Sequence, residues 1–216
     1  MKTDAQLKTD VTRELEWDPS VNATNIGVAV KNGVVTLTGH LDTYGEKYAV
    51  ERIVQRVQGV QALAVELDVK LAPEHKRSDS EIAEAAEVAL KWHSEIPNDR
   101  IQLRVEKGRI TLKGEVDWDF QRRAAERAVQ SLIGVVAVNN TIGLKVHATP
   151  ADIETRIRNA LERHALDESK RINVSVSDSK AILTGAVHSW SERMAAQGAA
   201  WSAPGIMNVE NNIRVA

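Results

Sequence analysis

Apolar and polar residues alternate along this chain in a pattern that occurs three times. Each occurrence is a short alternating run with a glycine in it and an aliphatic residue two positions after the glycine. Such alternation predicts a β-strand with one buried face, and the glycine marks a place where a side chain would be in the way. The glycines are 75 and 71 residues apart, so the 216-residue chain contains three tandem units. They are Gly39, Gly114 and Gly185.

Each unit is predicted to begin with a helix. A capping box, in which Ser or Thr is followed three residues later by Glu or Gln, begins at Thr3 and at Ser78. In the third unit Thr149 precedes Pro150, a residue favoured at the first helical position. Apolar residues then recur at helical spacing, which predicts one buried stripe on each helix. These residues are Leu7, Val11 and Leu15; Ile82, Ala86 and Leu90; and Ile153, Ile157 and Leu161.

An alternating strand and a short turn are predicted before each glycine-bearing strand, and a second helix after it. Thr43 and Ser189 begin capping boxes for this second helix in the first and third units, whereas Trp118 stands at the cap position in the second. A glycine followed by an aliphatic residue comes after each second helix, and such a glycine fits a left-handed helix C-cap. The pairs are Gly59-Val60, Gly134-Val135 and Gly205-Ile206.

A last alternating strand closes each unit and gives the order αββαβ, in which two helices can cover one face of a three-stranded mixed sheet. The predicted fold class is therefore α+β, with units over residues 1–73, 74–147 and 148–216. The connections between units are short, so we expect the units to lie close together, either as a pseudo-symmetric body or as a string. The apolar residues of the closing strands are Val65, Leu67 and Val69; Ile142, Leu144 and Val146; and Ile213 and Val215.

Composition limits the chemistry. The formal net charge is −2 and no unit is strongly basic, so we predict no nucleic-acid partner. There is no cysteine, which excludes disulfides, thiolate nucleophiles and cysteine-ligated metals. The histidines have no metal-ligand spacing and no catalytic signature is present, so we predict no catalytic residues, metal or cofactor. No segment resembles a signal peptide or membrane span, and the expectation is a cytoplasmic chain, although a trimmed mature chain would look the same.

The repeated pattern resembles the BON domain, named for bacterial osmotic-stress and nodulation proteins. The shared features are a capped helix, a hairpin carrying V-x-L-x-G-x-V, a second helix, a glycine-aliphatic pair and a closing strand, and they cover nearly the whole chain three times. The resemblance implies a phospholipid- or surface-binding module linked to envelope integrity and osmotic stress. It implies no catalytic residues. Many family members have two copies and a secretion signal, whereas this chain has three copies.

Aromatic residues at the start of the second helices are candidate contact residues. An aromatic wedge beside arginines could enter a headgroup boundary while the arginines meet phosphates, which predicts contact with an anionic phospholipid surface. Packing between units, or pairing with nearby acidic residues, explains the same pattern. Packing is also the favoured explanation for Trp17 and Trp92, at aligned ends of the first helices. The candidate contact residues are Trp118, Phe120, Arg122, Arg123 and Arg127.

The absence of catalytic signatures, together with what the resemblance to the BON domain implies, leads us to expect a non-enzymatic, stress-associated binding or scaffold protein. The predicted partner is an anionic phospholipid surface or an envelope protein, held by several weak sites joined through short linkers. A soluble protein-protein adaptor or a small-ligand-binding protein is the first alternative, and a hydrolase with a site between units is the second. The three strand glycines are explained either by close packing or by a backbone-lined groove.

Overall fold

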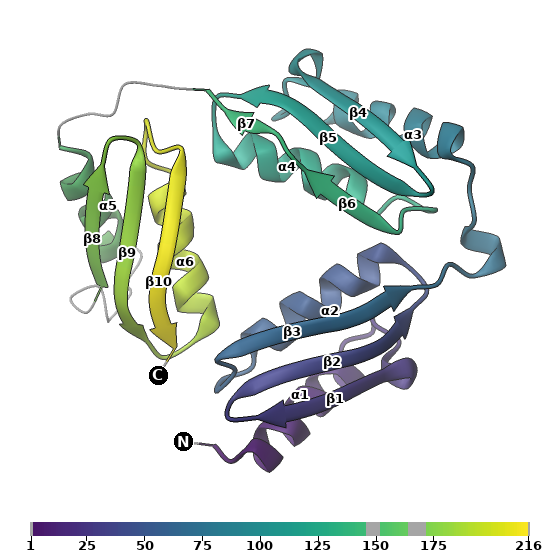
Figure 1. Ribbon diagram of the computed structural model, residues 1–216, viewed down its shortest axis with the longest axis horizontal. Coiled ribbons are helices and arrows are strands. Elements are labelled where there is room, and N and C mark those ends of the chain that lie inside the picture. The colour runs from purple at the N-terminus through teal and green to yellow at the C-terminus, as the bar shows by residue number, and fades with distance from the viewer. Residues whose placement is uncertain (1, 146–151, 164–171, 216) are drawn as a thin grey trace.

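Three units, each made of one sheet and two helices, follow one another along the chain (Figure 1). The structure is a computed structural model and describes residues 2–145, 152–163 and 172–215. The first unit contains α1 (Asp4–Trp17), β1 (Ile26–Lys31), β2 (Val34–Leu41), α2 (Tyr44–Arg56) and β3 (Ala62–Val69). The second contains α3 (Asp79–Trp92), β4 (Ile101–Glu106), β5 (Arg109–Val116), α4 (Asp119–Gln130), β6 (Ala137–Asn140) and β7 (Gly143–Leu144). The third contains α5 (Ile153–Arg163), β8 (Ile172–Ser177), β9 (Lys180–Val187), α6 (Trp190–Trp201) and β10 (Asn208–Val215).

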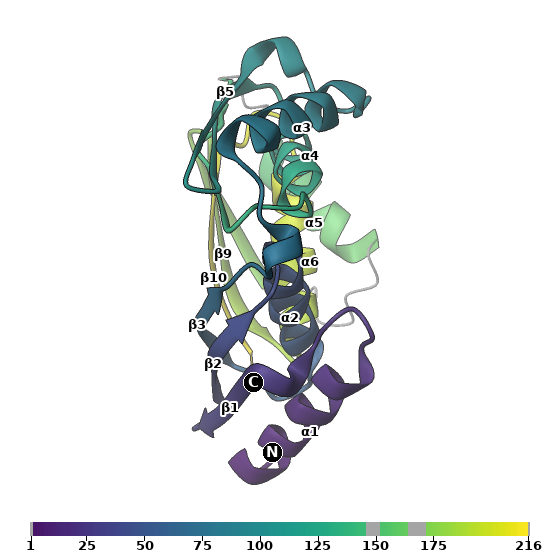
Figure 2. The same cartoon turned by 90° about the vertical axis from the view of Figure 1, so that its right-hand side faces the viewer.

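The sheets have the same topology in all three units, and the predicted α+β fold class with αββαβ units is confirmed. The glycine-bearing strand is central, antiparallel to the strand before it and parallel to the closing strand. In the second unit the closing strand is interrupted, and β6 and β7 both pair with β5. The helices cover one face of each sheet and leave the other face open (Figure 2).

Each unit has its own hydrophobic core between its helices and its sheet. The stripes predicted on the first helices are buried, as are most of the apolar residues predicted on the strands. The fully buried residues that the second helix of the third unit contributes to its core are all alanines. Val146 of the closing strand and the Thr149-Pro150 helix start lie outside the described residues.

The strand glycines lie where backbone crosses the central strand. Gly39, Gly114 and Gly185 have φ values of 123°, 138° and 131°, a backbone conformation that residues with a side chain rarely adopt. A Cβ on Gly39 would lie 2.0 Å from the carbonyl oxygen of Asn25, the residue that precedes β1. On Gly114 it would lie 2.1 Å from the corresponding oxygen of Arg100. At Gly39 and Gly114, a glycine is therefore required because the backbone before the neighbouring strand approaches too closely for a side chain.

The glycines after the second helices have a different role from the one predicted. Gly59, Gly134 and Gly205 do have positive φ, but α2, α4 and α6 end three or four residues before them. Each glycine instead lies inside a turn closed by a backbone hydrogen bond, as from Val60 N to Val57 O. The C-cap prediction is wrong because the helices end early and the positive φ belongs to the third residue of this turn.

An aspartate at the start of the first helix holds the hairpin turn in the first two units. The carboxylate of Asp4 accepts hydrogen bonds from the backbone N–H groups of Asn32 (2.8 Å) and Gly33 (3.0 Å). Asp79 accepts from Lys107 and Gly108, both at 2.8 Å. These backbone donors lower the pKa of both aspartates. The aligned residue of the third unit is Pro150, which has no carboxylate.

Acidification should release this contact in the first two units. A carboxyl whose pKa is lowered in the folded state stabilises that state above its ordinary pKa of 3.8, and this contribution is lost as the pH falls through the folded value. We expect hydrogen exchange at the amides of Gly33 and Gly108 to accelerate, relative to its intrinsic rate, as the pH falls below 3.8. Asp4→Asn and Asp79→Asn should show this faster relative exchange already at neutral pH. An unchanged protection factor in both variants would contradict the prediction.

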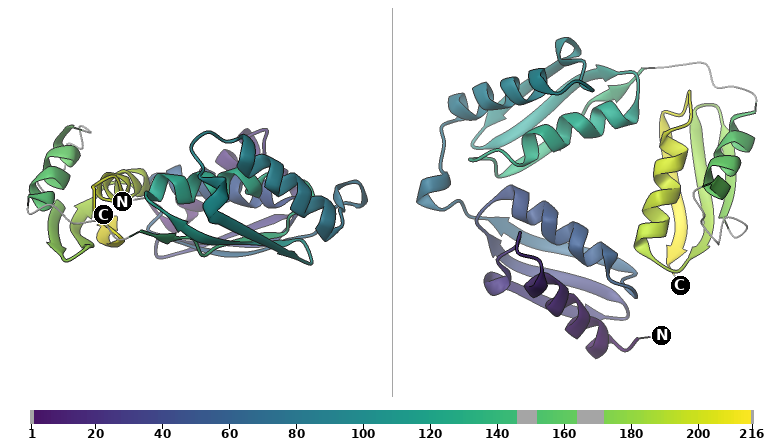
Figure 3. Two further views of the ribbon diagram at one scale, coloured as in Figure 1. Left: turned by 90° about the horizontal axis from the view of Figure 1, so that it is seen from above. Right: turned by 180° about the vertical axis from the view of Figure 1, so that it is seen from behind.

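The three units pack head to tail around an approximate threefold axis (Figures 1 and 3). The start of α2 lies beside the end of α4, where a Cβ on Gly45 would be 3.8 Å from the Cα of Ser131. The start of α4 lies beside the end of α6, and α6 contacts α2. All three sheets lie on one side of the molecule and all helices on the other, so the body has a helix layer and a sheet layer (Figure 2). The pseudo-symmetric alternative is thus the arrangement found.

Candidate functional sites at the junctions between units

The candidate contact residues predicted from the sequence gather at the junction of the second and third units. A hollow of about 630 Å³ lies there, between the start of α4 and the end of α6. Four of the five predicted residues line it. The lining from the second unit is Trp118, Asp119, Phe120, Arg123 and Arg127, and the lining from the third unit is Ala195, Gly198, Ala199, Trp201 and Ser202.

Asp119 is the buried charge that organises this junction. Its side chain is 4% exposed and forms ion pairs with Arg122 and with Arg123, the latter at 2.6 Å between Nε and Oδ2. The guanidinium of Arg122 also lies over the Trp201 ring of the third unit, 4.8 Å from its centroid. Two of the three predicted arginines are therefore neutralised within the protein, and one of them holds two units together.

Comparison of the units explains how Arg122 comes to this position. The aligned cation of the first unit, Lys47, donates to the carbonyl oxygen of Leu67 in the closing strand (2.8 Å). In the third unit Arg193 donates to the aligned oxygen of Ile213 (2.9 Å). Arg122 pairs with Asp119 instead. The position of Asp119 is occupied by Tyr44 and Trp190 in the other units, so the acidic residue redirects the arginine from its own strand toward the neighbouring unit.

The other predicted residues of this junction reach solvent. Trp118 is 37% exposed and Phe120 is 51% exposed. Trp118 supplies no side-chain cap, and the Gln121 side chain accepts from the N–H groups of Asp117 and Trp118, both at 3.1 Å. Arg127 is exposed at the edge of the hollow. These three side chains are the part of the predicted patch that an external partner can reach.

A second junction joins the first and second units through Tyr44. This side chain packs against the core of the second unit, beside the backbone of Val138. Burial raises the pKa of the Tyr44 phenol, with a smaller contribution from the carboxylate of Glu126. Tyr44 therefore fills its junction in the way that Trp201 fills the next one.

Trp17 and Trp92 are the most exposed large apolar side chains among the described residues, at 84% each. The prediction that they pack between units is wrong. They are the last residues of α1 and α3, the outer helices of their units, whereas the contacts between units are made by α2, α4 and α6 (Figure 3). The sequence pattern places both residues at helix ends but does not show which helices face a neighbour.

Two features of the junctions were missed by sequence reasoning. One is Trp201, an aromatic residue at a position where the other units have Gln55 and Gln130. That difference between copies was a usable signal. The other is a cavity between the first and third units, which no single repeat encodes because its walls come from both.

Among residues 2–145, 152–163 and 172–215 no group of three or more His, Asp or Glu side chains could hold a metal ion. Within these ranges no helix is long and apolar enough to cross a membrane.

The fold and the junctions define a class of protein built from repeated small αββαβ modules. The sequence model of the BON domain matches the chain three times, over residues 3–70, 78–146 and 149–216. The chain therefore belongs to the BON domain family, and the resemblance inferred from its repeats is confirmed. It is similar to the osmotically-inducible protein Y of Escherichia coli (strain K12), with 25% identity over 146 residues, which is 66% of this chain and 73% of that protein.

Solved structures give a weaker likeness. The chain is similar to the C-terminal domain of CdsD, the structural protein of the type III secretion system of Chlamydia trachomatis, with 16% identity and a TM-score of 0.26 over all of both chains. A further structure of CdsD gives 16% identity and a TM-score of 0.24, covering 96% of this chain and 91% of that one. The family and the sequence relative support a stress-associated BON-domain protein.

Proposed function

We propose that this chain is a non-enzymatic binding protein that attaches to the surface of phospholipid membranes through its helix layer. The observation that carries the proposal is the exposure of Trp17 and Trp92, each 84% accessible at the end of an outer helix. Both helices belong to the helix layer (Figure 2). The proposal requires both indoles to meet one surface together, which would give a bivalent contact.

The energy of such a contact comes mainly from apolar burial. An indole offers roughly 150–250 Å² of surface, and its N–H group suits the boundary between hydrocarbon and water. At about 25 cal/mol per Å², half insertion would contribute about 2–3 kcal/mol for each tryptophan. Exposed carboxylates on α3, at Glu81, Glu84 and Glu87, give no electrostatic attraction to anionic lipid. Attachment through Trp17 and Trp92 is therefore expected to depend little on salt.

The patch predicted from the sequence gives a second mode of attachment with a different signature. Trp118 and Phe120 are exposed beside Arg127, whose guanidinium has no ion pair among the described residues. Contact through this patch would strengthen with anionic lipid and weaken with salt, because a phosphate-guanidinium attraction is screened within about 8–10 Å. The two modes can be separated by one experiment.

Vesicle co-sedimentation tests the proposal. The double variant Trp17→Ala, Trp92→Ala should lose most binding to phosphatidylcholine vesicles at low and moderate salt, with an unchanged melting temperature because neither side chain is buried. Ile133→Ser serves as the control, since Ile133 is an exposed apolar residue outside these helix ends.

Each other outcome has a distinct meaning. If Phe120→Ser and Arg127→Glu abolish binding to phosphatidylglycerol vesicles while the tryptophan variant still binds, contact lies at the second junction. If the parent protein binds neither lipid, the membrane proposal is wrong and a soluble adaptor or envelope-protein partner becomes the function to test.

A further inference from the structure

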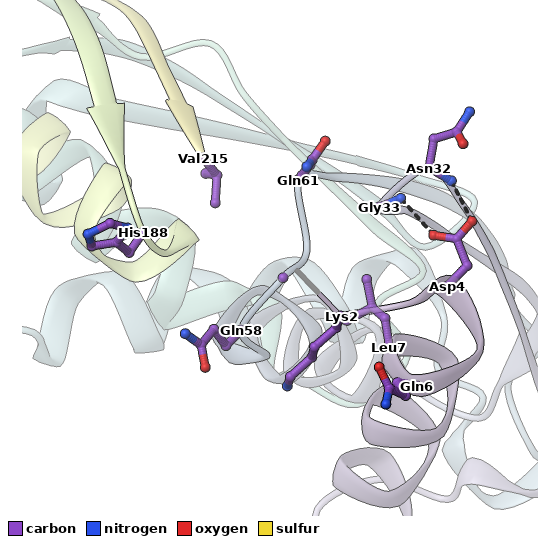
Figure 4. A pocket seen from close by; sticks show the side chains of 11 residues that line it. Lys2, Asp4, Gln6, Leu7, Asn32, Gly33, Gln58, Gln61, His188 and Val215 are labelled. Carbon is purple, nitrogen blue, oxygen red and sulfur yellow. Dashed lines mark hydrogen bonds between the residues drawn. The ribbon is translucent and has the colours of Figure 1, made fainter.

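A cavity lies at the junction that closes the ring, between the first and third units (Figure 4). Its volume is about 810 Å³, within the range of about 300–1,000 Å³ that is typical of small-molecule sites. The first unit contributes the start of α1, the β1–β2 turn and the α2–β3 turn. The third unit contributes His188 and Val215 from the opposite side (Figure 4).

This cavity exists because no large side chain fills its junction. Tyr44 fills the junction of the first and second units, and Trp201 fills that of the second and third. At the closing junction the first unit presents Gly59, Leu7 and the polar side chains of its turns, and the third unit presents His188 and Val215, both smaller than Tyr44 or Trp201. A ligand here would contact both ends of the ring at once.

The charged groups of the lining are already paired within the protein. The Asp4 carboxylate accepts hydrogen bonds from Asn32 and Gly33, as Figure 4 shows. The Lys2 ammonium forms an ion pair with Asp10 at 2.7 Å. A charged ligand would have to compete with one of these contacts, and one positive and one negative group give no preference for either sign. The lining is therefore matched to an uncharged ligand.

The remaining polar lining is rich in carboxamides. Gln58 and Gln61 each carry a group that both donates and accepts hydrogen bonds, and a hydroxyl does the same. We propose that this cavity is a binding site for a small uncharged polyhydroxylated molecule, such as a disaccharide or a polyol, held between the first and third units. Binding would fasten the closing junction of the ring. This site is independent of the membrane contact proposed above, which involves other residues.

Titration with trehalose and maltose, followed by the amide resonances of the ¹⁵N-labelled chain, tests the proposal. At sugar concentrations up to about 50 mM, which saturate a site with a millimolar Kd, we expect saturable shifts at Gln58, Gln61 and His188. The double variant Gln58→Leu, Gln61→Leu should bind at least tenfold more weakly. Gln102→Leu, at an exposed position on β4, is the matched control and should bind like the parent.

A second variant keeps the test independent of hydrogen bonding. His188→Trp should fill part of the cavity and abolish the shifts, and the fold should be retained because the hydrogen bond from this residue to Glu192 is made by its backbone N–H. The proposal is overturned if neither sugar gives saturable shifts at these residues. It is equally overturned if the shifts survive in both the glutamine and the His188 variants, or if sodium sulfate produces the same shifts.

Discussion

Replacing Gly114 with valine is expected to unfold the middle unit. A Cβ at this position would lie 2.1 Å from the carbonyl oxygen of Arg100 and 3.2 Å from the Cα of Ile101, both backbone atoms that cannot rotate away. The φ of 138° adds conformational strain. Overpacking and strain each cost about 1–3 kcal/mol, so the sum of about 2–6 kcal/mol is comparable to the whole stability of a small domain.

Thermal unfolding and the amide spectrum measure this effect. Gly114→Ala should already lower the melting temperature clearly, since the clash is with the Cβ atom itself. Gly198→Ala is the matched control, because a Cβ on Gly198 in α6 meets no atom within 4 Å and alanine favours a helix by about 1 kcal/mol over glycine. If Gly114→Ala and Gly198→Ala melt alike, the backbone crossing at Gly114 is not tight.

The fold could be predicted from the sequence because its determinants are local and occur in every unit. Capping boxes at Thr3, Ser78 and Thr43 are formed as expected, and the alternating strands have the expected buried faces. The sequence did not show which surface of one unit contacts which surface of the next. Trp17 was expected to be packed but is exposed, because a helix stripe reports burial within a unit and says nothing of a terminal residue that points away from it.

The candidate site could be predicted only in part for the same reason. The positions of Trp118 and Phe120 at one helix entry follow from their spacing in the sequence. The partner of Arg122 does not, since Trp201 comes from another unit and is brought there by the packing of whole modules. The cavity lined by Gln58 and His188 is further from prediction, because it is the space left where that packing closes.

Removing Asp119 is expected to uncouple the second and third units. Its carboxylate is nearly fully buried, whereas Arg122 and Arg123 are partly exposed, so Asp119→Ala leaves two guanidinium groups without their partner in a poorly solvated junction. Loss of one member of a fully buried pair costs about 3–5 kcal/mol, and partial exposure of the arginines reduces this to about 2 kcal/mol. We expect the two units to unfold in one transition in the parent protein and in two transitions in the variant.

Calorimetry with a matched ion pair isolates the role of burial. Glu106 pairs with Arg104 at 2.7 Å, but both side chains are mostly exposed, so Glu106→Ala should change the stability by less than about 0.5 kcal/mol. A double-mutant cycle between Arg122→Ala and Trp201→Ala then measures the contact across the junction directly, and contacting residues are expected to couple by about 0.5 kcal/mol or more. Additive effects in this cycle, together with an unsplit transition in Asp119→Ala, would mean that the aspartate stabilises only its own helix. The redirected arginine would then have no part in holding the ring together.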